Sequence, residues 1–185
     1  MEQKTKINAE DGKQELAITR EFDLPLELLF KAYIEPDLLQ QWMGTRVLKL
    51  ESKKHGSYQF ETTDPQGNKY AFNGVIHEFS PNRKIIRTFE MENTPFGVQL
   101  EFLEFEKLTA GTSRLNMHVV YESVAQRDQV LKLPLLKASI WPITGYKPSQ
   151  ANCHDKNKNE SKGRRLFEKG QTVAGGNGPV EKHTS

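Results

Sequence analysis

The sequence has little cysteine and no long hydrophobic run. Cys153 is the only cysteine among 185 residues, so the chain cannot form an internal disulfide or a cysteine metal cluster. No apolar stretch approaches the roughly 20 residues of a membrane-spanning helix. No apolar stretch follows the first charged residues either, as it would in a secretory signal. We therefore expect a globular protein without a membrane span that resides in the cytoplasm.

Signatures of catalysis and of metal binding are also missing from the sequence. It contains no glycine-rich phosphate loop and no nucleophile elbow, and no two histidines have metal-ligand spacing within one predicted element. Four carboxylates alternate with apolar neighbours and are expected to face solvent: Glu61, Glu78, Glu101 and Glu104. The sequence thus predicts no catalytic residue, no metal site and no cofactor, and it favours a protein without enzymatic activity.

The positive charge of the chain is concentrated at its C-terminal end. Eight of the 26 Lys/Arg and four of the 24 Asp/Glu lie in 142–185, which leaves 18 basic against 20 acidic residues before it. The main part of the chain therefore lacks the basic surface that nucleic-acid binding requires. Six of the 13 glycines also lie in 142–185. We expect a flexible segment at 1–13, a domain at 14–141 and a disordered, basic tail at 142–185.

Alternation of apolar and polar residues predicts a β-sheet. Seven strands are expected, at 14–22, 46–52, 57–63, 69–79, 83–91, 98–107 and 113–122. From the second strand onward they are separated by short turns rich in Gly, Pro and Asn. Because the connections are short, consecutive strands are predicted to be antiparallel neighbours. Gly74 lies inside the fourth of these strands, where it could mark a β-bulge.

Helices are predicted after the first strand and at the end of the domain. Two short helices are expected between the first and second strands, the first starting at Asp23 and Pro25 and the second ending at Gly44. A longer helix is expected to start at Ser123, where Gln126 completes the spacing of a capping box, to be kinked by Pro134 and to end near residue 140. A sheet with one apolar face needs a cover, and this last helix is long enough to provide one. The sequence therefore predicts an α+β fold.

Several segments, in this order and spacing, resemble the family of activators of heat-shock protein 90 ATPase homologues, which have START-like (SRPBCC), helix-grip domains. The matching segments are REFDLP at 20–25, LFKAY at 29–33, EPDLLQQW at 35–42, GSYQF at 56–60, GNK at 67–69, NGVI at 73–76 and SPNRKII at 80–86. The resemblance covers roughly residues 14–136. It implies a curved antiparallel sheet of about seven strands, with the C-terminal helix packed on the concave face and a cavity between them.

The resemblance leaves three functions open. The first is binding of a small apolar or amphipathic molecule in the cavity, without catalysis. The second is an interaction with a chaperone, by stimulation of a heat-shock protein 90 type ATPase. The third is a cyclase or hydrolase of the START-like kind, which would need an acid/base pair facing the cavity. Ligand binding is favoured because the sequence shows no catalytic constellation.

Aromatic and aliphatic residues of the predicted strands are the candidates for the cavity wall, because small-molecule pockets are mostly apolar with a few polar groups that orient the ligand. The predicted lining is Phe60, Phe72, Ile76, Phe89, Leu100, Met117 and Leu131. The polar element is expected to be His77 or Asn73, depending on which side of a bulge at Gly74 faces inward. Trp42 is expected to pack the second helix onto the sheet.

Overall fold

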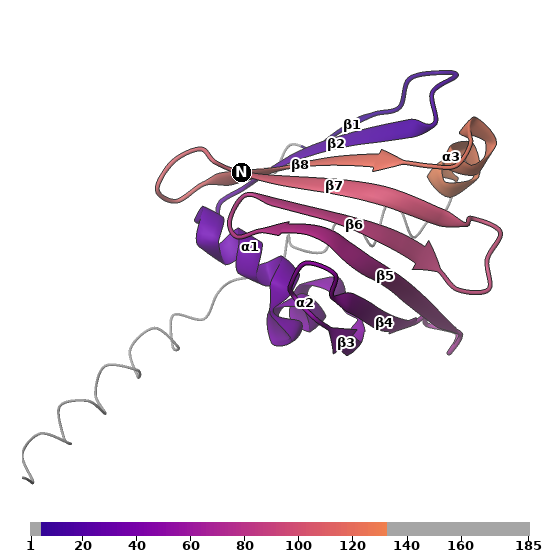
Figure 1. Cartoon of the computed structure of the whole chain (residues 1–185), viewed down its shortest axis with the longest axis horizontal. Helices are drawn as coiled ribbons and strands as arrows, with labels where there is room; N and C mark the ends of the chain where they lie inside the picture. Colours follow the sequence, from indigo (N-terminus) through magenta and orange to yellow (C-terminus); the bar gives the residue numbers. More distant parts are fainter. Residues whose placement is uncertain (1–4, 133–185) are drawn as a thin grey trace, which may run out of the picture. The chain divides into compact units, whose positions relative to one another are not determined.

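The computed structural model describes residues 5–132, in which eight strands form one sheet and three helices lie beside it (Figure 1). The strands are β1 (Thr5–Asn8), β2 (Glu15–Phe22), β3 (Arg46–Leu50), β4 (Ser57–Thr63), β5 (Lys69–Ser80), β6 (Lys84–Met91), β7 (Val98–Lys107) and β8 (Ser113–Val120). The helices are α1 (Leu26–Ile34), α2 (Pro36–Met43) and α3 (Val124–Leu131). The strand order is β1-β2-β8-β7-β6-β5-β4-β3, and every neighbouring pair is antiparallel. The predicted α+β class and antiparallel sheet are confirmed.

The sheet has one strand more than predicted. The additional strand is β1, which pairs with β2 at the edge of the sheet, in the segment 1–13 that was expected to be flexible. All four residues of β1 are exposed. An edge strand that buries no side chain shows no alternation of apolar and polar residues, so hydrophobic periodicity could not reveal it.

The two helices after β2 form where the sequence places their start and stop signals. Pro25, rather than Asp23, occupies the N-cap position of α1, and Pro36 opens α2, where its missing N–H costs nothing. Gly44 ends α2 in the left-handed conformation, with φ of 63°, as predicted. Trp42 donates a hydrogen bond from its indole Nε1 to the carbonyl of Ala32, which ties α2 to α1.

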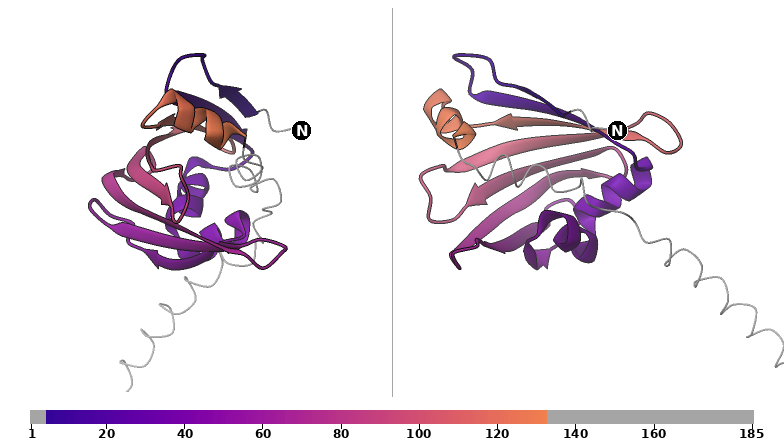
Figure 2. Two further views of the ribbon diagram at one scale, coloured as in Figure 1. Left: turned by 90° about the vertical axis from the view of Figure 1, so that its right-hand side faces the viewer. Right: turned by 180° about the vertical axis from the view of Figure 1, so that it is seen from behind.

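Both of these helices lie on the concave side of the curved sheet, as the edge-on view in Figure 2 shows. Phe30 of α1 packs between two aromatic rings of the sheet, with ring centroids 5.7 Å from Phe79 and 5.0 Å from Phe105. Leu29, Leu39 and Trp42 are buried in the same cluster. We call this cluster of α1, α2 and the strands beneath them the helix-side core.

Helix α3 covers the sheet at another place and makes a second, smaller core. Its N-cap is Ser123, whose hydroxyl accepts a hydrogen bond from the backbone N–H of Gln126 at 3.2 Å, so the predicted start is confirmed. Val130 packs with four buried residues of β2, β8 and the segment after β8, namely Leu16, Ile18, Val119 and Tyr121. We call this group the α3-side core. The predicted continuation of the helix to residue 140, the kink at Pro134 and the tail at 142–185 lie outside the described residues.

A β-bulge interrupts β5, but not at Gly74. The pairing of β5 with β6 shifts between Ile76 and Glu78, so that the bulge falls at His77. Gly74 lies opposite Tyr58 of β4, and a side chain at this position would overlap the Tyr58 hydroxyl and the carbonyl oxygen of Thr88. Glycine is therefore required at position 74, because the Tyr58 side chain passes close over the backbone of β5 there.

Among residues 5–132, no helix combines the length and the apolar character that crossing a lipid bilayer requires.

Candidate ligand-binding site

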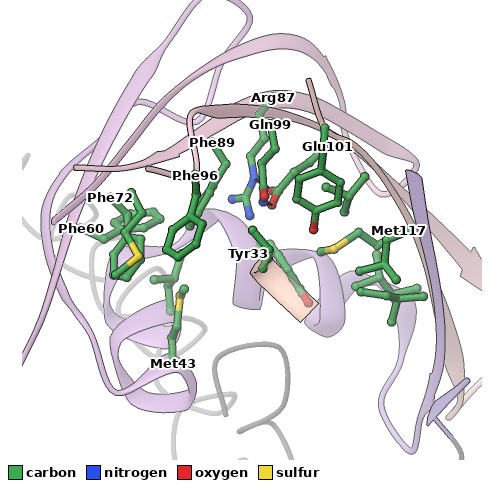
Figure 3. Close-up of a pocket in the computed structure, with 18 of the residues that line it drawn as sticks. Tyr33, Met43, Phe60, Phe72, Arg87, Phe89, Phe96, Gln99, Glu101 and Met117 are labelled. Carbon is green, nitrogen blue, oxygen red and sulfur yellow. Dashed lines mark hydrogen bonds and ion pairs between the residues drawn. The ribbon is translucent and has the colours of Figure 1, made fainter. Parts of the chain in front are cut away.

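The concave face of the sheet is covered from two places, and a cavity of about 230 Å³ lies between them (Figure 3). All five residues of the α3-side core line this cavity. Tyr33, Leu39, Trp42, Phe60 and Phe72 of the helix-side core line it as well. The cavity is thus the space that two short helices and α3 leave uncovered on a strongly curved sheet.

Apolar side chains make up most of the cavity wall. In β4 and β8 the inward positions alternate along the strand, which brings Phe60 and Thr62 from β4 and Leu115, Met117 and Val119 from β8 to the same side. The wall is completed from β6, the loop before β7, and α2 by Phe89, Met91, Phe96 and Met43. These side chains make the wall suitable for the apolar body of a small molecule.

Three polar side chains form a cluster on the sheet side of this apolar wall. Arg87 of β6 lies directly opposite Glu101 of β7, and its Nε donates to a carboxylate oxygen of Glu101 at 2.7 Å. The other oxygen of Glu101 accepts a hydrogen bond from the side-chain amide of Gln99 at 2.8 Å. Figure 3 shows the guanidinium of Arg87 beside Gln99 and Glu101, all three at the cavity. We call these residues the polar cluster.

The polar cluster is buried, which strengthens the electrostatic attraction between Arg87 and Glu101. Only 13% of the Arg87 side chain and 6% of the Glu101 side chain are exposed. Burial on its own would lower the pKa of Arg87, but the attraction and hydrogen bond of Glu101, together with Tyr58 and Tyr33, outweigh it and hold that pKa above its usual value. Arg87 therefore carries a permanent positive charge in surroundings of low dielectric constant.

Tyr58 holds the guanidinium of Arg87 from the side. Its ring lies 5.2 Å from the guanidinium carbon, a cation–π distance, and its hydroxyl donates to the carbonyl of Thr88 at 2.6 Å. The Tyr58 side chain reaches Thr88 by crossing over Gly74. Residues of β4, β5 and β6 thus together fix the orientation of the Arg87 side chain.

Two tyrosines add hydroxyl groups to the cavity. Tyr33 of α1 and Tyr121, which follows β8, both line it, and burial raises the pKa of each above that of an exposed tyrosine. Both hydroxyls are therefore neutral at physiological pH and can donate hydrogen bonds. Within residues 5–132, neither hydroxyl makes a hydrogen bond to another protein group.

Of the seven predicted apolar lining residues, four lie at the cavity and three do not. The four at the cavity are Phe60, Phe72, Phe89 and Met117. Ile76 faces the concave side but is buried in the helix-side core, and Leu131 packs beside the α3-side core while its neighbour Val130 reaches the cavity.

His77 and Leu100 point away from the cavity, which corrects their prediction as lining residues. His77 is exposed because it follows Ile76, whose side chain faces inward, and successive side chains of a strand alternate between its two faces. Leu100 alternates with Gln99 and Glu101, the residues of β7 that face inward, so it lies on the convex side of the sheet. Asn73, the alternative polar residue, also lies off the cavity and forms a hydrogen bond with Glu92.

The prediction that Glu101 faces solvent is wrong, and the polar cluster was missed. Strand β7 carries apolar residues on both faces, Leu100 and Phe102 on one and Leu103 and Phe105 on the other. Its apolar pattern therefore fits either orientation. A usable signal was the hairpin of β6 and β7, whose pairing sets the opposite charges of Arg87 and Glu101 face to face.

Metal binding has no support from the side chains of this region. Across 5–132, no group of three His, Cys, Asp or Glu side chains comes together in a way that could hold a metal ion.

Comparison with known structures shows the same fold in bacterial proteins. A crystal structure of a protein from Rhodobacter sphaeroides matches with 23% identity and a TM-score of 0.64, over 73% of this chain and 90% of that one. A crystal structure from Mycobacterium smegmatis matches with 22% identity and a TM-score of 0.64, over 74% and 90%. A solution structure from Arthrobacter aurescens matches with 15% identity and a TM-score of 0.65, over 72% and 83%. At these identities the likeness shows the fold alone.

Comparison of the sequence with protein families gives a more specific result. No curated protein matches the chain. The family model described as "Activator of Hsp90 ATPase homolog 1-like protein" matches residues 23–133, which is more than half of the chain. The chain belongs to this family.

Proposed function

We propose that this protein binds a small apolar or amphipathic molecule in the cavity between its two cores, without chemically changing it. The family and its fold fit either a ligand-binding domain or one associated with an Hsp90 ATPase. The observation that carries our proposal is a cavity of about 230 Å³ with an apolar wall and a buried polar cluster at its side. Small-molecule sites commonly combine these features.

The size of the cavity argues against a simple packing defect. Protein interiors are close-packed, with few voids larger than a water molecule. The space between the two cores has a volume of about 230 Å³, far more than one water molecule occupies. A small molecule that fills this space would give the apolar side chains of the wall partners to pack against.

The polar cluster supports binding rather than catalysis. An enzyme of the cyclase or hydrolase kind needs a group at the cavity that can take or give a proton. Glu101 is the only carboxylate among the described lining residues, and both of its oxygens accept hydrogen bonds, from Arg87 and from Gln99. With both oxygens engaged in this way, the carboxylate of Glu101 serves to orient its partners.

The proposal is tested by a series of straight-chain alcohols from butanol to dodecanol, with affinities measured by calorimetry. The cavity has about the volume of eight water molecules in the liquid, so it suits a ligand of roughly eight to ten non-hydrogen atoms. We expect the affinity to rise with chain length up to that size and then to fall. No binding, or an affinity that rises without a maximum as adsorption to an open surface would give, contradicts the proposal.

A matched pair of substitutions assigns the binding to the cavity. Val119 lies in the cavity wall and Val98 is exposed on the outer face of β7. Val119→Phe is expected to move the affinity maximum to shorter alcohols, whereas Val98→Phe leaves it in place. The chain-length maximum of the unaltered protein tests the proposal even if Val119→Phe does not fold.

The family match favours a second candidate, an interaction with an Hsp90-type chaperone. The matching family is described by its likeness to an activator of the Hsp90 ATPase, and the match covers residues 23–133. If this function applies, the purified protein raises the ATPase rate of an Hsp90 in a saturable manner. An unchanged rate at saturating protein would remove this candidate and leave ligand binding unaffected.

A further inference from the structure

The direction of the Arg87 side chain indicates which end of a ligand it would bind. A guanidinium has hydrogen-bond donors on Nε and on two terminal nitrogens, Nη1 and Nη2. Arg87 uses Nε for its bond to Glu101. Within the described part of the chain, neither Nη nitrogen donates a hydrogen bond, although the residue lines the cavity. The Nη1–Nη2 side of the guanidinium is therefore available to a molecule in the cavity.

The neighbours of Arg87 leave mostly donors for a ligand. Both oxygens of Glu101 are engaged, one by Arg87 and the other by the Gln99 amide. The hydroxyls of Tyr33 and Tyr121, which are neutral, add two further donors to the lining. A ligand group that meets the guanidinium of Arg87 must accept hydrogen bonds.

We propose that the ligand of the cavity is an amphipathic carboxylate, whose two oxygens accept hydrogen bonds from Nη1 and Nη2 of Arg87 while its apolar body fills the space between the two cores. This inference rests on the proposed function, because it names the class of molecule bound. A carboxylate matches the planar pair of guanidinium donors with two parallel hydrogen bonds. A neutral hydroxyl offers a single oxygen, so it cannot form two parallel hydrogen bonds with this pair of donors, and it brings no charge.

The test compares octanoate with octanol, which have the same apolar chain and differ in the head group. Calorimetry near neutral pH is expected to show octanoate binding at least tenfold more tightly than octanol. Arg87→Gln is expected to abolish this preference while octanol still binds. Arg114→Gln is the matched control, because Arg114 is also paired with glutamates but lies on the surface. It should leave the preference unchanged.

A second variant guards against misfolding of Arg87→Gln, which leaves Glu101 buried without its partner. The double substitution Arg87→Met with Glu101→Leu removes both charges and keeps the volume similar. It is expected to bind octanol and to show no preference for octanoate.

The outcomes separate this inference from the proposed function. Equal affinities for the two probes, tighter binding of octanol, or a preference for octanoate that survives in the double variant would overturn the carboxylate inference while cavity binding stands. Failure of both probes to bind the unaltered protein would overturn the proposed function itself.

Discussion

Arg87 and Glu101 form a buried ion pair in the middle of the sheet, and their energetics differ from those of the pairs on the surface. Removing one partner of a buried pair leaves the other charge without compensation, which typically costs 3–5 kcal/mol, whereas an exposed pair contributes about 0–1 kcal/mol. The side chains of Arg114 and Glu21, which form an ion pair at 2.7 Å, are 32% and 53% exposed. The distance within each pair is the same, so burial sets the difference.

Glu101→Gln is therefore expected to lower the free energy of unfolding by about 3 kcal/mol. Glu21→Gln makes the same chemical change at the exposed pair and should cost less than about 1 kcal/mol. Urea denaturation at neutral pH measures both values. Equal losses for the two variants would show that the Arg87–Glu101 pair is not desolvated as described.

At the scale of the elements, strand β5 is shaped by two departures from a regular strand. Gly74 lets the Tyr58 side chain cross over β5 to the carbonyl of Thr88, and the bulge at His77 shifts the alternation of the residues that follow it. The first feature affects the site, because Tyr58 contacts the guanidinium of Arg87. A small residue in one strand thus orients a charged residue in the next.

Gly74→Ala is expected to destabilise the protein by about 1–3 kcal/mol or more, because the added methyl group overlaps the Thr88 carbonyl and the Tyr58 hydroxyl. Gly111→Ala is the matched control, since a Cβ at that glycine meets no atom within 4 Å. Thermal denaturation of the two variants gives the comparison. A similar melting temperature for both would contradict the close packing of Tyr58 over Gly74.

The elements were more predictable from the sequence than the directions of the side chains. Caps, prolines and glycines act locally, so α1, α2 and the start of α3 follow from a few residues such as Pro36, Gly44 and Ser123. The inward face of a strand depends on which partner and which register it has. In β7 the apolar residues are compatible with either face of the strand pointing to the concave side. In β5 the bulge changes which alternate residues point to that side partway along the strand. The polar cluster was missed for this reason.

At the scale of the described domain, residues 5–132, the central feature is a sheet whose concave face carries two separate cores. Helices α1 and α2 cover one part of the concave face and α3 another, and each makes a core of its own. The cavity lies between these cores, and the polar cluster borders it from β6 and β7. The fold therefore creates an apolar space with an oriented positive charge, which is the arrangement that an amphipathic acid requires.

Methionine side chains allow this arrangement to be observed directly. The chain has four methionines, and three of them, Met43, Met91 and Met117, line the cavity. Protein labelled with ¹³C at the methionine methyl groups and mixed with octanoate can be examined by NMR for nuclear Overhauser effects between ligand and methyl protons. We predict such effects from the octanoate chain to the methyl groups of these three methionines. Octanoate that binds without any effect at these three methyl groups would place the ligand outside the cavity and contradict the account.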